Sequence, residues 1–425
     1  MGKISFKMTR KEKPLPIVDG IKKEFSFFKG NYAVIVLSWI LIDFAFELPA
    51  TYYALYVLEL GATETIIGMI GLALFLAMAF VQFPGGYLAD KFGRKWLISS
   101  MTFGVAFCYI LYAVAPSWHF VFIGAVFLGL VSVYDPAVNA IVADSLPPEK
   151  RGMGFGIVTL IVGATTTPGP FVAGIFYNQF GLVQGMRISY GIVVALWFTA
   201  AILRLRLKET IENPRKPSLN ELLFSYPKAL KESFGVWKTV PRSMFFLLLA
   251  FVSFSFGWAA AEPYLVVYAV NELGIPKEVW PLMLTALFVA TIVFAVPAGK
   301  AVDKFNRKVP LLTSFAVAVV AIWLFVTGDS LRLLISLLIF GVTMVIARAA
   351  YSALEADLTP KEQRGKVSGF RNLLTYIVMG VGNLIGGALY EHLSPQLPFF
   401  FAMVFFVPSF ILTLSMVHEP EKREE

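Results

Sequence analysis

Long blocks of apolar residues recur along the whole chain, and short polar segments separate each block from the next. Each block has about the 20 residues that an α-helix needs to cross the hydrocarbon core of a bilayer. The blocks predict helices over 31–58, 64–88, 96–115, 118–142, 153–177, 186–203, 243–270, 279–299, 309–327, 331–353, 366–390 and 398–417. The pattern therefore predicts an all-α integral membrane protein with twelve transmembrane helices.

Composition supports a membrane protein and excludes several other classes. Hydrophobic residues make up 57% of the chain and charged residues only 15%, whereas charged residues make up about a quarter of a soluble protein. The long apolar runs differ from the short alternating strands of an outer-membrane β-barrel. A single cysteine, Cys108, and three widely spaced histidines exclude a disulfide framework and a Cys/His metal centre. We expect neither a metal nor a cofactor.

Lysine and arginine are distributed unevenly between the two sets of alternate loops. One set, together with both tails, holds 31 of the 36 basic residues, and the opposite set holds Arg187, Lys277 and Arg332. Because cytoplasmic loops carry the excess of basic residues, both termini are expected to be cytoplasmic, in a cell (plasma or inner) membrane. Residues 1–30 lack the pattern of a cleaved signal. The net charge of +8 follows from this bias, so it does not indicate nucleic-acid binding.

The polar stretch 204–242 divides the predicted helices into two sets of six. Ser218 and Glu221 form a capping-box pattern, and apolar residues follow at helical spacing, which favours an amphipathic helix on the inner membrane surface. The alternative is a tether with no role beyond geometry. The expected parts are a cytoplasmic N-tail 1–30, an N-terminal bundle 31–203, the linker 204–242, a C-terminal bundle 243–417 and a C-tail 418–425.

An internal repeat relates the two bundles. Residues 213 positions apart match across the halves, and many of the matches are polar loop residues, so chance similarity of apolar helices does not explain them. Examples are the pairs Asp90 and Asp303, Arg94 and Arg307, Asp144 and Asp357, and Gly169 and Gly382. Since six is even, the repeats are parallel. The sequence predicts two parallel pseudo-symmetric six-helix bundles with the substrate path between them.

The segment Gly86-Tyr-Leu-Ala-Asp90-Lys-Phe-Gly93-Arg94-Lys resembles the loop signature of the major facilitator superfamily, and 299–308 is a second copy with Asp303 and Arg307. Lys91 departs from the usual Arg, and Asn306 replaces the second Gly. The resemblance implies that Asp90 lies against the start of helix 366–390 and closes the cytoplasmic face. Glycines here allow a tight turn and close helix approach. The alternative is that the basic residues only enforce topology.

Residues Gly169-Pro170-Phe-Val-Ala-Gly174 are similar to a motif associated with antiporters of this superfamily, with Ala173 as a departure. Small residues allow close helix packing and proline bends a helix, so the motif could seal the outer end of the cavity. The alternative is ordinary small-residue packing. Arg371, near the start of its helix, is expected to snorkel or to meet Asp90 rather than to bind substrate.

Five charged residues lie inside predicted spans, where a charge is costly and usually faces a cavity or a partner: Asp43, Glu47, Asp135, Glu262 and Arg348. The resemblance places the helices that carry them around the central cavity. Asp43 and Glu47 share a helix face. Asp135 and Arg348 are one repeat offset apart and of opposite charge. We predict that they form an ion pair that closes the cytoplasmic half.

Asp43 and Glu47 are interpreted as proton carriers and cation attractors, because loss of water favours the neutral form of a carboxyl group. For Glu47 the alternative is a helix-end acid wetted by the outer vestibule. Glu262 precedes Pro263, so its alternative role is to satisfy backbone groups at a kink. Trp258, one turn from Glu262, is the aromatic residue expected to stack on an organic substrate.

These features predict a secondary active transporter that works by alternating access, most simply a proton-coupled antiporter that exports an organic cation or amphiphilic compound. Four acids against one arginine favour cations. The alternatives are a sugar, amino-acid or lipid transporter, and a transport-inactive sensor or scaffold. No nucleotide-binding loop and no nucleophile–base pair is present, so an enzyme is not expected. The expected partners are a small molecule, protons and lipid, without nucleic acid, and the chain is expected to act as a monomer.

Overall fold

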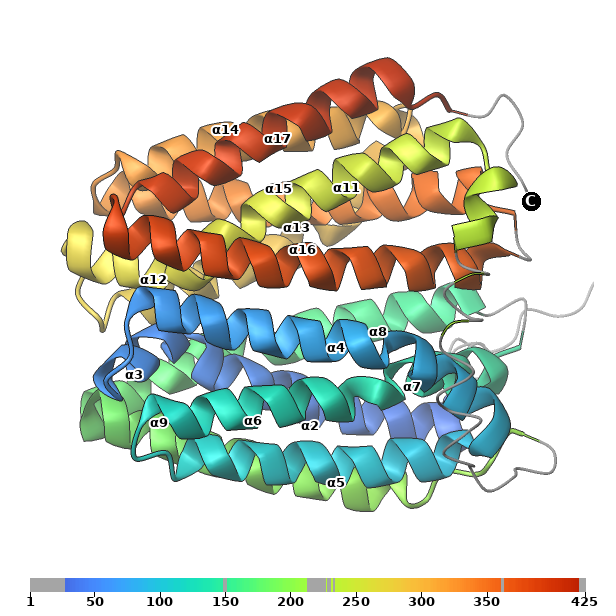
Figure 1. The fold of residues 1–425 in the computed structure, drawn as a ribbon, viewed down its shortest axis with the longest axis horizontal. Coiled ribbons are helices and arrows are strands. Elements are labelled where there is room, and N and C mark those ends of the chain that lie inside the picture. Colours follow the sequence, from blue (N-terminus) through green and yellow to red (C-terminus); the bar gives the residue numbers. More distant parts are fainter. Residues whose placement is uncertain are drawn as a thin grey trace, which may run out of the picture.

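The computed structural model describes residues 27–147, 151–211, 227, 231, 234–360 and 363–419. Every regular element within these residues is a helix. The helices form two groups that lie side by side (Figure 1). We call the group α2–α9 the N-half and the group α11–α17 the C-half. The end of the molecule at which α9 ends and α11 begins is the linker end, and the opposite end is the far end.

The N-half contains α2 (Gly30–Ala50), α3 (Tyr53–Glu59), α4 (Glu64–Phe92), α5 (Arg94–Ala113), α6 (Trp118–Val131), the short turn η1 (Ser132–Tyr134), α7 (Asp135–Ser145), α8 (Arg151–Thr166) and α9 (Pro168–Arg204). The C-half contains α11 (Arg242–Ala261), η4 (Glu262–Tyr264), α12 (Leu265–Val267), η5 (Tyr268–Glu272), α13 (Trp280–Lys304), α14 (Lys308–Val326), α15 (Ser330–Leu358), α16 (Arg364–His392) and α17 (Leu397–Met416).

Eleven segments of the described chain are long and apolar enough to cross a membrane. One of them covers 49 residues, 156–204, and contains both of the helices that the sequence predicts at 153–177 and 186–203. Gly181 bends this segment with φ 72° and ψ 178°, a backbone conformation that glycine adopts without a steric penalty. The difference between twelve predicted helices and eleven segments therefore reduces to this bend.

Three predicted helices are interrupted at positions that carry chemistry. Helix 31–58 breaks at Thr51 and Tyr52, helix 118–142 at η1, and helix 243–270 at η4. Pro136 and Pro263 stand at the second and third breaks, where a missing backbone N–H weakens the helical ladder. Asp135 and Glu262 are the residues directly before these prolines, so both acids lie where the helix is broken.

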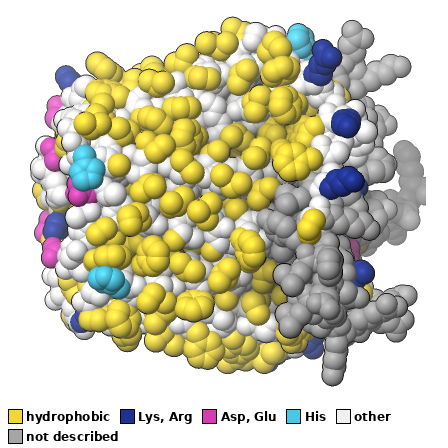
Figure 2. All heavy atoms as spheres, viewed as in Figure 1, with side chains coloured by type: hydrophobic (Ala, Val, Ile, Leu, Met, Phe, Trp, Pro, Cys, Tyr) yellow, Lys and Arg dark blue, Asp and Glu magenta, His cyan; other side chains and the backbone are white. Residues whose placement is uncertain are grey.

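An apolar belt surrounds the molecule. Figure 2 shows hydrophobic side chains across the middle, acidic side chains gathered at the far end, and lysine and arginine mainly at the linker end. Large apolar side chains on the belt are well exposed, among them Phe80 at 61%, Phe107 at 59% and Val404 at 63%. A soluble protein would not expose so much contiguous apolar surface, whereas lipid covers it. The predicted class, a multi-pass helical membrane protein, is confirmed.

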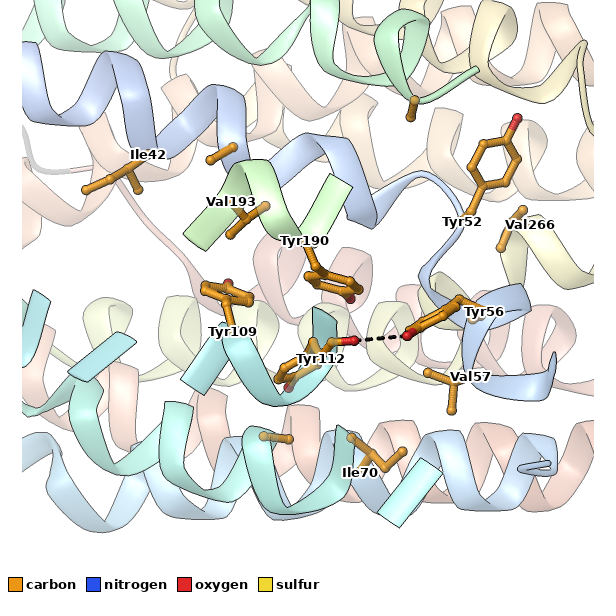
Figure 3. Close-up of a cluster of buried hydrophobic side chains, with 14 of the residues drawn as sticks. Ile42, Tyr52, Tyr56, Val57, Ile70, Tyr109, Tyr112, Tyr190, Val193 and Val266 are labelled. Carbon is orange, nitrogen blue, oxygen red and sulfur yellow. Dashed lines mark hydrogen bonds between the residues drawn. The ribbon is translucent and has the colours of Figure 1, made fainter. Parts of the chain in front are cut away.

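Tyrosines fill the far-end part of the N-half core. The rings of Tyr112 and Tyr190 lie 5.2 Å apart, and Tyr109 stacks on Tyr190 at 6.1 Å. The Tyr56 hydroxyl donates to the Tyr112 backbone carbonyl at 2.9 Å (Figure 3). These contacts join α3, α5 and α9, so the N-half is held as a unit on the side that faces α2.

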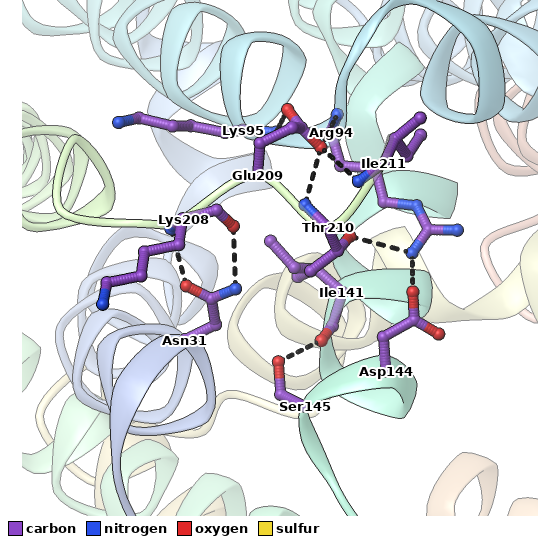
Figure 4. Close-up of polar contacts among 10 residues, drawn as sticks. All are labelled: Asn31, Arg94, Lys95, Ile141, Asp144, Ser145, Lys208, Glu209, Thr210 and Ile211. Atoms are coloured by element: carbon purple, nitrogen blue, oxygen red, sulfur yellow. Dashed lines mark hydrogen bonds and ion pairs between the residues drawn. The ribbon is translucent and has the colours of Figure 1, made fainter. Parts of the chain in front are cut away.

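Ion pairs at the linker end fasten each half internally. In the N-half, Arg94 pairs with Asp144 and donates to Thr210, and the Glu209 carboxylate accepts the backbone N–H groups of Arg94 and Lys95 at 3.0 and 3.1 Å (Figure 4). Glu209 thereby caps the N-terminus of α5, where a negative charge is favourable. The start of the linker is thus fixed to the N-half.

The C-half repeats this arrangement. Arg307 pairs with Asp357, and the Glu419 carboxylate accepts the Lys308 backbone N–H at 2.7 Å. Arg307 and Asp357 lie 213 positions after Arg94 and Asp144. The offset found in the sequence therefore recurs as equivalent ion pairs.

The amphipathic helix predicted from Ser218 and Glu221 lies outside the described residues. The described end of the linker packs on the C-half. Phe234 and Trp237 contact Phe370 of α16, with ring centroids 4.9 and 5.3 Å apart. This end of the linker therefore packs on α16 through aromatic side chains.

Candidate functional site

The two halves are joined by hydrogen bonds at the far end. Tyr52 donates to the Lys277 carbonyl at 2.6 Å, and Trp280 donates to the Thr51 carbonyl at 3.1 Å. On the other side of the interface, Tyr264 donates to the Glu64 carbonyl at 3.2 Å, and the Thr65 backbone N–H donates to the Glu391 carboxylate at 2.9 Å. A weaker contact joins the Thr65 hydroxyl and His392, 3.5 Å apart, at the same end. The far end is closed.

The N-half packs against α13 through small residues. A methyl group on Gly174 would lie 3.1 Å from Pro281, and one on Gly163 would lie 3.3 Å from Ile292. Nearer the linker end, a methyl group on Gly156 or on Gly299 would meet nothing within 4 Å, so these two positions leave room for added volume.

The seam between α4 and α16 is formed by small residues. A methyl group on Gly68 would lie 2.5 Å from the Asn383 carbonyl, and one on Gly387 would lie 2.4 Å from the Glu64 carbonyl. Phe75 stacks on Tyr376 farther toward the linker end, with centroids 6.3 Å apart. Only glycine permits so close an approach of the two backbones.

Asp43 and Glu47 lie on α2, and Glu47 lies beside Gly169 near the start of α9. A methyl group on Gly169 would lie 2.5 Å from the Glu47 Cβ, so this glycine leaves room for Glu47. Pro170 is buried beside it. The Asp43 Oδ2 atom is buried and has no hydrogen-bond partner among the described residues. An unpaired buried carboxylate oxygen is costly, and a bound proton or cation removes the cost.

Glu47 interacts electrostatically with Asp43 and with Glu262 of the C-half. Glu262 is exposed although it lies within a membrane-spanning segment. Asp43 and Glu47 therefore form one acidic face of α2, and Glu262 is an exposed acid of the C-half at the break before Pro263.

Trp258 stacks on Phe340 of α15, with ring centroids 4.3 Å apart and an interplanar angle of 19°. One face of the indole is therefore occupied by the protein itself. The half-buried indole leaves room for a ligand on one face at most. Stacking of an organic substrate on Trp258 stays a prediction, and only the free face of the indole is available for it.

The ion pairs found among the described residues in this conformation do not include one between Asp135 and Arg348. Asp135 is half-buried at the η1–α7 junction and interacts with Arg204. Arg348 is exposed on α15. Because the predicted pair belongs to a state that is closed at the linker end, it stays a prediction for that state.

Arg204 is a charged residue that the sequence pattern assigned to the linker and that the structure places inside the N-half. Its residue exposure is only 1%. The guanidinium donates to the Ser38 hydroxyl at 3.0 Å and to the Thr102 hydroxyl at 2.8 Å. The sequence did not reveal the buried role of Arg204, because an arginine just before a basic stretch is typical of a residue that flanks a helix on the cytoplasmic side.

Arg371 has a partner that the sequence analysis did not name. It pairs with Glu355 of α15 and lies over the rings of Phe251 and Tyr351, 5.9 and 5.8 Å from their centroids. Its predicted contact with Asp90 stays a prediction, because the Asp90 side chain lies outside the described part of the structure. Glu355 was missed because it follows the predicted end of its helix; its position seven residues after Arg348, on the same helix, was the available signal.

The predicted gating loops are described only in part. The side chains of Asp90 and Asp303 lie outside the described part of the structure. Gly93 has φ 103° and makes the turn between α4 and α5, as predicted. The close helix approach is made by Gly85 rather than Gly86: a methyl group on Gly85 would lie 2.3 Å from the Val133 carbonyl, whereas one on Gly86 would meet nothing within 4 Å.

Sequence comparison finds relatives among membrane transporters. An MFS-type transporter of Methanocaldococcus jannaschii is 25% identical over 359 residues, which cover 83% of this chain and 89% of the relative. The multi-drug resistance efflux pump PmrA of Streptococcus pneumoniae is 26% identical over 72% of this chain and 74% of its own. The quinolone resistance protein NorA of Staphylococcus aureus is 24% identical over 79% of this chain and 84% of its own.

Solved structures share the fold. The nucleoside transporter NupG aligns with a TM-score of 0.68 over 91% of this chain and 98% of its own, at 14% identity. A bacterial homologue of the human lysosomal transporter Spinster, in an inward-facing and unoccupied conformation, aligns with a TM-score of 0.70 over 92% of this chain and 98% of its own, at 16% identity.

The helical fold and the transporter relatives define this chain as a membrane transporter rather than an enzyme. The family model described as Major Facilitator Superfamily matches residues 35–289 and 268–425. The chain belongs to this superfamily, and the resemblance seen in its loop motifs is confirmed.

Proposed function

We propose that the chain is a proton-coupled antiporter that exports organic cations or amphiphilic compounds. The observation that carries the proposal is the pair of intramembrane acids on α2: the Asp43 Oδ2 atom is buried without a hydrogen-bond partner among the described residues, and Glu47, one turn further along, lies beside Gly169. Carboxylates that share a site repel each other, and either a proton or an organic cation relieves the repulsion. The two ligands therefore compete for the same charge, and competition of this kind is the physical basis of exchange.

The named relatives support export of drug-like compounds. PmrA is described as a multi-drug resistance efflux pump and NorA as a quinolone resistance protein. The Gly169-Pro170 segment supports the same direction through its contact with Glu47, because it connects the antiporter-like motif to an acid of the proposed site. Trp258 contributes one aromatic face to an organic ligand.

The proposed transport cycle is alternating access by two parallel pseudo-symmetric six-helix bundles, 31–203 and 243–417. The linker end is assigned to the cytoplasm because most basic residues belong to it, in a plasma membrane with both termini inside. The far end, where hydrogen bonds join the halves, is then the outside. Opening the far end requires loss of the Tyr52–Lys277 and Thr65–Glu391 hydrogen bonds.

The gating residues act at the two ends of this cycle. Asp90 and Gly86 belong to the loop that closes the cytoplasmic end, while Gly93 and Arg94 hold that loop on the N-half and Asp303 and Arg307 do the same on the C-half. Arg371 keeps the start of α16 in place through Glu355. Gly169, Pro170 and Gly174 seal the far end.

Proteoliposomes test the function. The purified chain, which is expected to act as a monomer, is reconstituted with a pH gradient, and ethidium movement is followed by fluorescence. A proton gradient should drive ethidium movement opposite to proton flow, and Asp43→Asn should abolish this movement while ethidium counterflow persists. Glu59→Gln, an exposed far-end acid, is the matched control. Gradient-driven flux that is unchanged in Asp43→Asn would contradict the assignment of Asp43.

A second candidate function is transport of anionic compounds. Arg348 favours it, because this arginine is exposed within a span and has no ion-pair partner among the described residues. An exposed intramembrane cation attracts an anionic group. Proton-driven uptake or release of a fluorescent anion such as carboxyfluorescein, lost in Arg348→Gln, would favour this candidate over the first.

A further inference from the structure

Two of the hydrogen bonds between the halves are related by the internal repeat. Tyr52 of the N-half donates to the Lys277 carbonyl at 2.6 Å, and Tyr264 of the C-half donates to the Glu64 carbonyl at 3.2 Å. Glu64 is the first residue of α4, and Lys277 precedes α13. Because Glu64 and Lys277 lie 213 positions apart, the two acceptors are equivalent carbonyls of the two repeats.

The two donors also occupy related places. Tyr52 lies in the break between α2 and α3, and Tyr264 is the last residue of η4, which breaks the helix after α11. The position 213 residues before Tyr264 is Thr51, directly before Tyr52, so the tyrosines differ from exact equivalence by one residue. Each broken helix thus places a tyrosine hydroxyl on a carbonyl of the other half. The contact recurs although the alignment slips by one residue, which favours a role for the contact itself.

Both hydroxyls are enclosed by the protein. The residue exposure is 1% for Tyr52 and 0% for Tyr264. The Tyr264 hydroxyl also donates to the Asn383 carbonyl of α16 at 2.9 Å, and a methyl group on Gly387 would lie 2.6 Å from the hydroxyl oxygen. One hydroxyl proton serves both carbonyls there, so the bond of Tyr264 to the other half is weaker than that of Tyr52. Separation of a buried donor from its acceptor is costly, so each contact opposes opening of the far end.

Each tyrosine lies close to an acid of the candidate site on its own helix. Glu262 and Tyr264 are the first and last residues of the three-residue turn η4. Glu47 lies about one turn before the other break, where the Thr51 hydroxyl donates to the Glu47 carbonyl at 3.1 Å. The Thr51 carbonyl in turn accepts the indole N–H of Trp280 at 3.1 Å. Because residues of one short turn move together, a displacement of the acid also displaces the contact with the other half.

We infer that Tyr52 and Tyr264 are a symmetry-related pair of positioning residues that connect the acid-bearing helix breaks to closure of the far end. Each hydroxyl holds one broken helix against the other half, and the far end opens when both contacts are lost. The inference rests on the proposed transport cycle, and it names the contacts through which the acids act on the far end.

Pulsed electron spin resonance on the purified full-length protein, without any substrate, tests the two contacts. Labels at His119→Cys and Arg332→Cys, exposed far-end positions of different halves, report the opening in a Cys108→Ser background. Tyr52→Phe should raise the ratio of open to closed molecules about fivefold, since it removes one buried hydrogen bond between the halves. Tyr264→Phe should raise this ratio about twofold, and the double variant should show roughly the product of the two effects.

Two tyrosines at the same end are matched controls, because their hydroxyls bond within one half. Tyr56 donates to the Tyr112 carbonyl at 2.9 Å, and Figure 3 shows the Tyr52 hydroxyl directed away from this contact. Tyr268 donates to the Val326 carbonyl at 3.0 Å. Tyr56→Phe and Tyr268→Phe should lower thermal stability but leave the label distances unchanged. Equal distance distributions in Tyr52→Phe and Tyr56→Phe, in proteins that fold, overturn the inference.

A double-mutant comparison tests the connection with the acid. Glu262→Gln should shift the ratio of open to closed molecules, because it alters η4, and this shift should disappear once Tyr264→Phe has removed the contact. The shift should persist on top of Tyr52→Phe, which lies on the other broken helix. A shift that is the same in both backgrounds, or absent from the otherwise unaltered protein, overturns the inference. If thermal denaturation shows that Tyr264→Phe does not fold, Tyr52→Phe and its control Tyr56→Phe decide alone.

The distance measurements are independent of transport. Absence of proton-driven ethidium movement in the unaltered protein would reject the proposed function and leave the distances interpretable. In the reverse case, normal exchange with unshifted distances in Tyr52→Phe would reject the paired contacts and keep the antiporter.

Discussion

The Glu391 carboxylate of α16 accepts the backbone N–H of Thr65 at the start of α4, 2.9 Å away, and so joins the two halves at the far end. The first N–H groups of a helix lack partners within the helix, and a carboxylate there also interacts favourably with the helix dipole. His392 lies 3.5 Å from the Thr65 hydroxyl and supports the same contact. An acid of one half thus caps a helix of the other.

The first prediction concerns this cap. Glu391→Gln should weaken closure of the far end by about 1 kcal/mol, a roughly fivefold shift of the conformational equilibrium toward the outward-open state. The shift is measured by pulsed electron spin resonance between labels at Glu59→Cys and Glu278→Cys, two exposed far-end positions, in a Cys108→Ser background. Glu272→Gln, another exposed acid of the C-half, should leave the distance distribution unchanged. Equal distributions in the two variants would contradict the role of the cap.

The second prediction uses two glycines of the same segment as a matched pair. Gly169→Val should abolish transport or folding, because even its Cβ would lie 2.5 Å from the Glu47 Cβ. Gly156→Ala should be tolerated and should stabilise α8 slightly, by up to about 1 kcal/mol, because nothing lies within 4 Å of the added methyl group. Thermal denaturation and ethidium flux report both effects. Unchanged thermal stability and ethidium flux in Gly169→Val would contradict a role of this glycine in positioning Glu47.

The third prediction concerns Asp90 near the end of α4. If its carboxylate stabilises the start of α16 in the state that is closed at the linker end, Asp90→Asn should favour the open state by about 0.3–1 kcal/mol. A cysteine at Gly156, where an added methyl group meets nothing within 4 Å, should then react faster by a few fold. Lys91→Gln serves as a control for a purely topological role. An unaltered rate in Asp90→Asn leaves topology as the only function of this loop.

The sequence predicted the parts of the fold that depend on one element at a time. Apolar length identified the membrane-spanning helices, and the 213-residue offset anticipated that Arg94 and Arg307 would occupy equivalent environments. The break at Pro263 matches the kink considered for Glu262, and the gap predicted between 177 and 186 contains the bend at Gly181. The break before Pro136 was not predicted, although proline explains it, because proline cannot complete the helical ladder.

The parts that were missed depend on packing between distant segments. Arg204 is indistinguishable in sequence from the basic residues that follow it, and its partners Ser38 and Thr102 lie more than 100 positions away. Glu391 has the pattern of a surface acid at a helix end, and only the arrangement of α4 beside α16 converts it into a cap. Polar residues at helix ends are therefore ambiguous until their neighbours are known.

The last prediction concerns Asp135 and Arg348, which lie one repeat offset apart on opposite halves. They do not form an ion pair among the described residues of this conformation, in which Asp135 interacts with Arg204 and Arg348 is exposed. Closure of the linker end brings the two halves together at this depth, so Arg348 is expected to become a second cation for Asp135 in the closed state. Loss of one partner then leaves an unpaired buried charge that costs roughly 3–5 kcal/mol.

Each single neutralisation, Asp135→Asn or Arg348→Gln, should therefore impair ethidium exchange by tenfold or more, since about 1.4 kcal/mol already corresponds to a factor of ten. The exchange Asp135→Arg with Arg348→Asp should restore part of the activity if the pair alone matters. Arg204 limits this rescue, because an arginine at position 135 would face a second fixed cation. A triple variant that adds Arg204→Met removes this repulsion and should restore more activity than the double exchange. Failure of both exchanges, in proteins that fold, would reject the pair and favour Arg348 as a ligand for an anionic group.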